Sequence, residues 1–270
     1  MTAPLRVALV QLAVADGEPA DNLARAAALI RGAPAADLYL LPELFTTGYA
    51  HDAWAQAARE STPGVAATLQ QLADARGAWI GGSMIAEVAG GGLANRFHLF
   101  APAGAAGAAP VTYDKAHLFP PMGEPGRLTP GGARVRSCVG RGVAADVALS
   151  ICFDLRFPEQ YRLDAVAGAT LFACVAEWPH PRGDTLRLLA RARAAENQAW
   201  LALCNRVGPA RDGTVFCGGS CVIAPDGAVV ADAGDGVDTV TVAEVDVGAA
   251  HRARAGFAVL GLRVPGVDAE

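Results

Sequence analysis

The stretch Ala148-Leu-Ser-Ile-Cys-Phe-Asp-Leu-Arg-Phe-Pro-Glu159 decides the fold, because a buried strand ends in it and a turn into a helix begins. Residues 147–151 are small or apolar, and charged and turn-forming residues follow directly after Cys152. We therefore predict a strand that delivers the Cys152 thiol to a strand-to-helix turn. At such a turn, unpaired backbone N–H groups at the start of the helix can face a developing anion. A free Cys is also a common core residue, so a functional interpretation needs further support from the chain.

Segments with strand and helix patterns alternate along most of the chain on both sides of this stretch. The predicted strands are residues 5–12, 37–41, 79–87, 95–101, 111–113, 133–138, 143–151, 169–175, 199–206, 214–223, 228–231 and 238–245. The predicted helices are residues 21–30, 52–60, 64–76, 158–167 and 184–197. We expect Thr62-Pro-Gly64 to break the chain between the second and third helices. The alternation is typical of layered α/β architecture, and we expect one domain over residues 1–270.

Two segments rich in Pro, Gly or Ala interrupt the alternation. Residues 101–110 are of low complexity and predict a mobile surface loop. Residues 115–132 predict a long loop of the kind that either contributes to function or is disordered.

The composition excludes several classes of protein. The 270 residues are 52% hydrophobic, which is enough for a substantial core, and no apolar stretch is long enough to span a membrane. The formal net charge of -5 and the scattered Lys and Arg residues argue against a nucleic-acid partner. Residues 5–15 have some features of a signal peptide, but Gln11 interrupts them and their length suits a buried strand. We therefore expect a cytoplasmic protein.

The cysteines are expected to be reduced thiols rather than disulfides or metal ligands. The chain has six Cys residues, no CxxC pair and no clustered His. Cys217 and Cys221 lie four residues apart in a predicted strand, so we expect both on one face and buried in the core rather than at a zinc site.

Two further polar residues follow buried strands in the same way as Cys152. Glu43 comes directly after Leu38-Tyr-Leu-Leu-Pro42, and Lys115 comes directly after residues 111–114. Ligands bind at the carboxyl ends of strands in open α/β sheets, so we expect the three side chains to meet. Each alone has a plain structural interpretation, because Glu43 could cap a helix and Lys115 could be a solvated loop charge.

Together these three residue types form a coherent set for attack on an amide. A carboxylate with a raised pKa can remove the proton of a thiol as it attacks, which suits Glu43. A fixed ammonium and a backbone N–H can stabilise the resulting oxyanion, which suits Lys115 and the N–H of Phe153.

Four motifs in order extend this interpretation to most of the chain. They are Leu-Pro-Glu43, Tyr-Asp-Lys115-Ala-His-Leu-Phe119, Cys152-Phe-Asp-Leu-Arg-Phe-Pro158 and Ala194-Ala-Glu-Asn-Gln198. The chain from about residue 5 to residue 245 resembles the nitrilase, or carbon-nitrogen hydrolase, superfamily. The resemblance implies a four-layer αββα sandwich, a triad of Glu43, Lys115 and Cys152, a Cys thioester intermediate, no metal or organic cofactor, and a homodimer. It also implies a second Glu in the loop after the Lys, a position that Glu124 matches, with the role of orienting Lys115 or the substrate.

The Cys152 motif, followed by Glu177-Trp-Pro179, most resembles the ω-amidase branch. Those enzymes release ammonia from the terminal amide of short α-keto acid monoamides. Where that branch has Asn, this chain has Glu177, whose carboxylate would repel a substrate carboxylate unless an Arg neutralised it. Arg156 and Arg182 could do so, although we expect Arg156 to pair with Asp154 or Glu159. Trp178 could line the pocket or simply pack.

We therefore expect an amidase that acts on a small-molecule amide, the ω-amide of a short α-keto acid in particular. The same triad could instead act on an N-carbamoyl compound or on a deaminated-glutathione-type amide. A nitrilase-fold binding module without activity is the remaining alternative, although such a module is usually expected to lack a triad residue.

Overall fold

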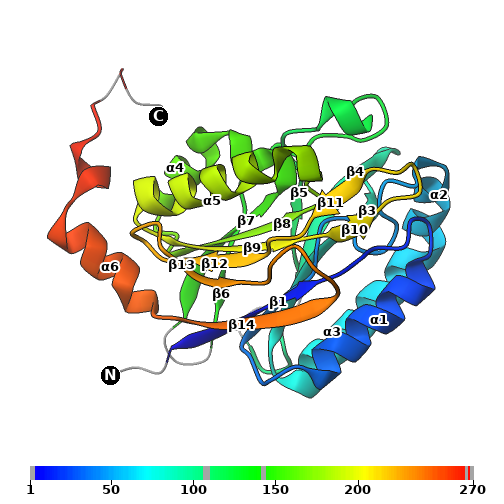
Figure 1. The fold of residues 1–270 in the computed structure, drawn as a ribbon, viewed down its shortest axis with the longest axis horizontal. Coiled ribbons are helices and arrows are strands. Elements are labelled where there is room, and N and C mark those ends of the chain that lie inside the picture. Colours follow the sequence, from blue (N-terminus) through cyan, green and yellow to red (C-terminus); the bar gives the residue numbers. More distant parts are fainter. Residues whose placement is uncertain (1–3, 106–109, 141–143, 265–266, 268–270) are drawn as a thin grey trace.

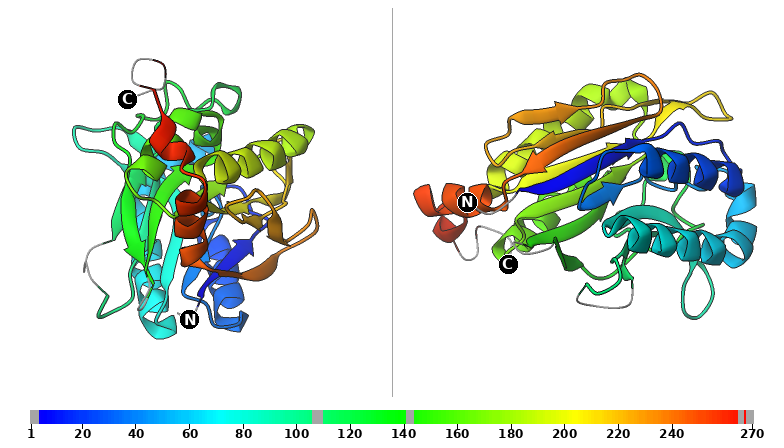
Figure 2. Two further views of the ribbon diagram at one scale, coloured as in Figure 1. Left: turned by 90° about the vertical axis from the view of Figure 1, so that its left-hand side faces the viewer. Right: turned by 90° about the horizontal axis from the view of Figure 1, so that it is seen from below.

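The computed structural model describes residues 4–105, 110–140, 144–264 and 267. Its centre consists of two six-stranded sheets that pack face to face, and helices lie on the outer face of each sheet (Figures 1 and 2). The predicted α/β class with a four-layer αββα sandwich is therefore confirmed. The prediction of a mobile loop at 101–110 falls in part on residues 106–109, which lie outside the described residues.

The first sheet has the strand order β14-β1-β2-β3-β4-β5. Its strands are β1 (Leu5–Gln11), β2 (Leu38–Leu40), β3 (Trp79–Glu87), β4 (Leu93–Phe100), β5 (Val111–Asp114) and β14 (Thr239–Val245). β1, β2 and β3 run parallel to one another. β14 pairs antiparallel with β1, β4 pairs antiparallel with β3, and β5 pairs antiparallel with β4. Side chains alternate along β1: Val7 and Leu9 lie in the core that the two sheets share, whereas Ala8 and Val10 pack beneath helices α1 (Pro19–Gly32) and α3 (Thr62–Arg76).

The second sheet has the order β13-β12-β9-β8-β7-β6. Its strands are β6 (Arg136–Val139), β7 (Ala145–Ile151), β8 (Leu171–Ala176), β9 (Trp200–Asn205), β12 (Cys221–Ile223) and β13 (Val229–Asp232). The three central strands β7, β8 and β9 are parallel and almost entirely buried, which explains their continuous apolar sequences. Helices α4 (Pro158–Val166) and α5 (Gly183–Asn197) cover the outer face of this sheet (Figure 1).

The remaining elements are short. They are α2 (His51–Gln56), a π-helical segment (Ala57–Ser61), the hairpin strands β10 (Val207–Pro209) and β11 (Val215–Cys217), α6 (Val247–Gly256), and 3-10 turns at Pro120–Met122, Cys152–Arg156, His180–Arg182 and Val259–Leu262. Within the described ranges, no helix is long and apolar enough to cross a membrane.

The structure corrects two of the predicted elements. Thr62-Pro-Gly64 does not break the helix, because the chain passes from α2 through the π-helical segment directly into α3. Pro63 lies in the first turn of α3, where a missing N–H costs no helical hydrogen bond. The predicted strand 214–223 is two strands in different sheets, because Gly218 (φ +60°) and Gly219 (φ +68°) turn the chain between them.

The cysteine predictions hold in part. All six cysteines are free, and Cys138 is the exposed one. Cys217 and Cys221 are both buried in the core, as predicted, but they lie on β11 and β12 and not on one face of a single strand.

Candidate active site

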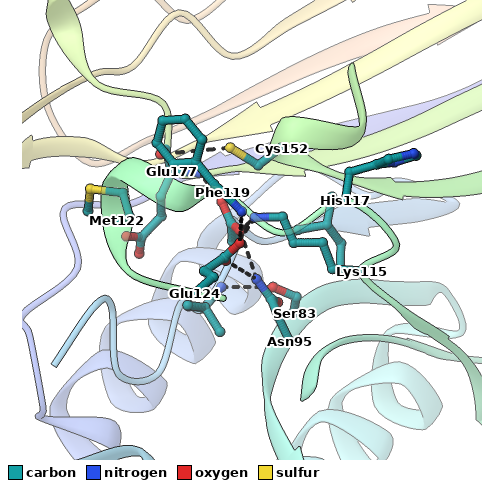
Figure 3. A network of polar contacts seen from close by, with 12 residues as sticks. Ser83, Asn95, Lys115, His117, Phe119, Met122, Glu124, Cys152 and Glu177 are labelled. Atoms are coloured by element: carbon teal, nitrogen blue, oxygen red, sulfur yellow. Dashed lines mark hydrogen bonds and ion pairs between the residues drawn. The ribbon is translucent and has the colours of Figure 1, made fainter. Parts of the chain in front are cut away.

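Three predicted site residues, Glu43, Lys115 and Glu124, form one buried polar cluster; Figure 3 labels Lys115 and Glu124. Glu43 follows β2, Lys115 follows β5, and Glu124 lies in the long loop after β5. Lys115 Nζ donates to Glu43 Oε1 and to Glu124 Oε1, each at 2.8 Å, and all three side chains are 0% exposed. Glu124 Oε2 also accepts a hydrogen bond from the backbone N–H of Phe119 at 2.6 Å. The loop that was predicted as functional or disordered therefore closes over the cluster and is tied to it.

Two residues of the cluster were not identified from the sequence. Asn95 on β4 donates to Glu43 Oε1 at 2.7 Å, and the Tyr49 hydroxyl donates to Glu124 Oε1 at 3.0 Å. Asn95 is fully buried, but in the sequence it is only the first residue of a predicted strand, which gives no clear signal of this role. Tyr49 lies in an irregular segment, where periodicity gives no indication of burial.

Cys152 lies where predicted, at the end of β7 and the start of a 3-10 turn, with a positive φ of 45°. Asp154 fixes this turn: its Oδ2 accepts hydrogen bonds from the Ile151 N–H at 2.9 Å and from the Tyr113 hydroxyl at 2.7 Å. Its Oδ1 accepts a hydrogen bond from the His117 N–H at 3.0 Å. Asp154 thus joins the Cys152 turn to the chain on either side of Lys115, and this connection offsets the strained backbone of a non-glycine residue in the left-handed region.

The surroundings of the Cys152 thiol and of the Glu43 carboxyl raise the pKa values of both groups. Burial, together with the nearby charge of Glu43, raises the pKa of Cys152 well above its usual value, and Lys115 only partly opposes this. Burial also raises the pKa of Glu43, against the lowering effect of Lys115. Cys152 is therefore a neutral thiol at rest and requires a base next to it in order to react.

Lys115 is the fixed positive charge of the site. Burial alone would lower the pKa of Lys115, but the charges of Glu43 and Glu124 outweigh burial and raise the pKa above its usual value. An ammonium has three N–H donors, and the two carboxylates take two of them. One donor of Lys115 is left for another acceptor.

A small, narrow pocket opens onto Cys152. Its lining consists of Phe119, Cys152, Phe153, Arg156, Trp178, Pro179 and Arg182. Phe153 is the second residue of the 3-10 turn, where backbone N–H groups have no partner within the helix. The pocket therefore brings a thiol and a helix-start N–H together.

Arg156, Arg182 and Trp178 line this pocket, and the expected ion pair of Arg156 is absent from the described residues. Arg156 forms no ion pair with Asp154 or Glu159; its guanidinium lies 5.2 Å from the centre of the Trp178 ring. Both carboxylate oxygens of Asp154 already accept the hydrogen bonds described above, which leaves no free acceptor position for Arg156. Arg182 lies 5.5 Å from the centre of the Phe119 ring. Among the described side chains, neither guanidinium has a carboxylate partner.

Glu177 was predicted as a substrate-binding candidate, but it does not line the pocket. Its carboxylate is 0% exposed and pairs with Arg206, whose Nη1 donates to Glu177 Oε2 at 3.0 Å. In Figure 3 it is the backbone carbonyl of Glu177 that faces the Cys152 sulfur. Arg206 is therefore the neutralising arginine, in place of the two that the sequence suggested.

Arg206 was missed although it shows the same signal as the other site residues. It follows the buried strand β9 directly, with Asn205 before it, and its side chain is 0% exposed. The predicted strand was drawn through residue 206, so this polar strand end went unnoticed. No group of three or more His, Cys, Asp or Glu side chains that could hold a metal ion occurs in the part of the chain that the structure describes.

A sandwich of two sheets and outer helices, with a thiol, an ammonium and a carboxylate after its strands and a second carboxylate in the loop after β5, is the arrangement expected of an amide-hydrolysing enzyme. The family model described as carbon-nitrogen hydrolase matches residues 6–255, and the chain belongs to this family. The nitrilase-superfamily interpretation from the motifs is thus confirmed.

Several known proteins are similar to this chain over most of its length. An (R)-stereoselective amidase from Pseudomonas sp is 36% identical over 233 residues, which are 85% of this chain and 81% of that protein. The omega-amidase YafV of Escherichia coli (strain K12) is 33% identical over 253 residues, which are 94% of each chain. XC1258 from Xanthomonas campestris, a CN-hydrolase superfamily protein with an arsenic adduct in the active site, is 30% identical, with a TM-score of 0.88 over 97% of this chain and 98% of that one.

Proposed function

We propose that this enzyme releases ammonia from the terminal amide of a short α-keto acid by way of a Cys152 thioester. The buried cluster of Glu43, Lys115 and Glu124 beside the Cys152 thiol is the observation on which this proposal depends. The roles of the catalytic residues follow from which atoms of this cluster are already occupied.

Glu43 acts as the general base through its Oε2 atom. Oε1 already accepts hydrogen bonds from Lys115 and Asn95, whereas Oε2 accepts one, from the Glu177 N–H at 2.8 Å. A carboxylate oxygen has two lone pairs, so Oε2 alone has capacity for a further proton. The thiol proton passes to this atom while the sulfur forms a bond with the amide carbon.

The oxyanion of the tetrahedral intermediate forms next to Lys115 and the Phe153 N–H. The third N–H donor of Lys115 and the start of the 3-10 turn supply fixed positive charge at that point. One such donor is worth about 10²–10³-fold in kcat in comparable sites. Glu124 and Tyr49 hold the ammonium in place through Glu124 Oε1.

Collapse of the intermediate breaks the carbon–nitrogen bond. The proton held by Glu43 moves to the departing nitrogen, and ammonia leaves with the thioester in place on Cys152. Glu43, again a carboxylate, then removes a proton from a water molecule that attacks the thioester carbon, and the carboxylic acid product and the free thiol result. No step requires another reactant.

The pocket supports a substrate with its own carboxylate. Arg156 and Arg182 line it without a carboxylate partner in the described chain, and guanidinium groups bind carboxylates in planar, bidentate geometry. Glu177 does not repel such a substrate, because Arg206 neutralises it. The name of the Escherichia coli relative, an omega-amidase, agrees with this class, whereas the Pseudomonas relative is named a stereoselective amidase.

An ammonia-release screen tests the proposal. It compares ω-amides of α-keto acids with neutral aliphatic amides, amino acid amides, deaminated-glutathione-type amides and N-carbamoyl acids. We expect the ω-amides to have the highest kcat/KM, and the variants Arg156→Met and Arg182→Met to raise KM for them without a matching rise for neutral amides. Highest turnover with an N-carbamoyl acid, marked by carbon dioxide together with ammonia, would refute the substrate assignment. Absence of turnover on every class would favour the binding-module alternative.

We also propose that the enzyme is a cytoplasmic homodimer. Its six free cysteines suit a reducing compartment such as the cytoplasm. Phe257 and Leu262 near the C-terminus are 67% and 70% exposed, and exposed apolar side chains of this kind suit a subunit interface. Sedimentation equilibrium should give twice the chain mass, and a monomer at micromolar concentration would refute the dimer.

A further inference from the structure

Glu177 contacts both groups that react in the proposed mechanism, and it does so through its backbone. Its N–H donates to Glu43 Oε2 at 2.8 Å, and its carbonyl oxygen lies 3.9 Å from the Cys152 sulfur (Figure 3). The position of this one residue therefore sets both the orientation of the carboxylate and the direction of the thiol.

The side chain of Glu177 anchors that backbone to a buried arginine. Arg206 Nη1 donates to Glu177 Oε2 at 3.0 Å and to Asp16 Oδ1 at 2.8 Å, and Nη2 donates to the Val14 carbonyl at 2.8 Å. The guanidinium thus links the end of β8 to the segment after β1 in the opposite sheet. Gly48, in the loop after Glu43, packs against the same link, because a Cβ there would lie 2.7 Å from Arg206 Nη1.

Stability alone does not account for a carboxylate at this place. Glu177 is 1% exposed and its Oε1 has no hydrogen-bond partner among the described residues. Burial raises the pKa of Glu177 to about 8, although Arg206 opposes the shift. A buried ion pair with an unsatisfied oxygen is a poor source of stability compared with apolar residues of similar volume.

We propose that Glu177 is a positioning residue: the hydrogen bond that its side chain accepts from Arg206 fixes the peptide that aims Glu43 at Cys152. This inference rests on the proposed roles of Glu43 and Cys152. The neighbouring Trp178 is held separately, since its N–H donates to Asn205 Oδ1 at 2.8 Å, and Arg206 keeps Asp16 and Val14 as partners without Glu177. Truncation of Glu177 should therefore loosen one peptide and leave the fold in place.

The test compares Glu177→Ala with Glu177→Gln, whose amide oxygen can still accept from Arg206. Asp164→Ala is the matched control, because Asp164 is also a buried carboxylate paired with an arginine, Arg134, at 2.8 Å, and it makes no hydrogen bond to Glu43 or Cys152. For each variant we measure kcat and KM for ammonia release, the melting temperature, and the rate at which iodoacetamide alkylates the peptide that contains Cys152.

We expect Glu177→Ala to lower kcat and the Cys152 alkylation rate by about tenfold or more with KM little changed, since small misplacements of reacting groups are costly. Glu177→Gln should restore most of both rates. A Glu177→Ala variant no slower than Asp164→Ala, a rise in KM at unchanged kcat, or a Gln variant as slow as the Ala variant would each overturn the proposal. Alkylation does not depend on amide turnover, so a wild-type enzyme inactive on amides would refute the proposed function and still allow this test.

Discussion

Replacing Lys115 by Met should separate the structural and chemical roles of the buried cluster. Met fills a similar volume, so the change removes the ammonium and leaves Glu43 and Glu124 facing one another with 0% exposed side chains. Both carboxylates lose an ion pair of 2.8 Å, and their mutual repulsion is no longer offset. Removal of one partner from a buried ion pair costs about 3–5 kcal/mol, and we expect a loss of stability of that size at pH 8.

The loss should depend on pH in a defined direction. The pKa of Glu43 is already raised by burial, and without Lys115 it rises further. A carboxyl whose folded pKa lies above its unfolded value of about 4.3 stabilises the fold below that value, and this stability is lost as pH rises through the folded pKa. The difference in free energy of unfolding between wild type and Lys115→Met should therefore be smaller at pH 5 than at pH 8.

Urea denaturation at both pH values measures this deficit. The double variant Lys115→Met/Glu124→Gln removes the repulsion, and we expect it to recover about 1–3 kcal/mol at pH 8. Arg187→Met, which breaks two partly exposed ion pairs, with Asp232 and Asp235, should cost about 1–2 kcal/mol or less. Both Lys115 variants should lose at least about 10²-fold in kcat. A deficit that is equal at the two pH values, or a double variant no more stable than the single one, would refute this view of the cluster.

Two further predictions concern groups outside the cluster. Burial, aided by the charge of Arg96, lowers the pKa of His98 to about 4. The fold is therefore stabilised while His98 is neutral. We expect this stabilisation, up to about 3 kcal/mol, to be lost as pH falls from about 6.5 through 4. In a plot of the free energy of unfolding against pH, His98→Gln should flatten the region between pH 6.5 and 4. The exposed His251→Gln should leave that region unchanged. Equal plots for wild type and His98→Gln would contradict the assignment. Burial raises the pKa of Cys174 and of Cys221 to about 12, so peptide mapping after brief iodoacetamide treatment at pH 7.5 should find Cys138 modified and these two intact. Rapid modification of either buried thiol in the folded protein would show that the core is more open than described.

Most of the fold could be predicted from the sequence because its signals are local. Glu43, Lys115 and Cys152 each follow a strand, β2, β5 and β7 respectively, within three residues of its end, and this was enough to bring them together as candidates. Strand order could not be predicted in the same way. The antiparallel pairing of β1 with β14 joins chain segments that are far apart in sequence, and periodicity carries no information about such partners.

The site was predicted less completely than the fold for a related reason. The burial of Asn95 and Tyr49 beside Glu43 follows from packing between distant elements, which leaves only a weak trace in the sequence. Glu177 was identified, but its role depends on Arg206, 29 residues further along the chain. Arg156 was expected to pair with a neighbouring carboxylate, yet Asp154 is occupied by Tyr113 and by the Ile151 N–H.

A Cys152 acyl-enzyme is the central claim, and rapid-quench intact-mass spectrometry during turnover of an ω-amide tests it most directly. We expect a wild-type mass increase equal to the acyl group, located on the peptide that contains Cys152 and released by hydroxylamine. Cys152→Ala should fold, show no adduct and release no ammonia, whereas Cys138→Ala should behave as wild type. Sustained ammonia release by Cys152→Ala, or wild-type turnover without any adduct on that peptide under acyl-enzyme-trapping conditions, would contradict the mechanism.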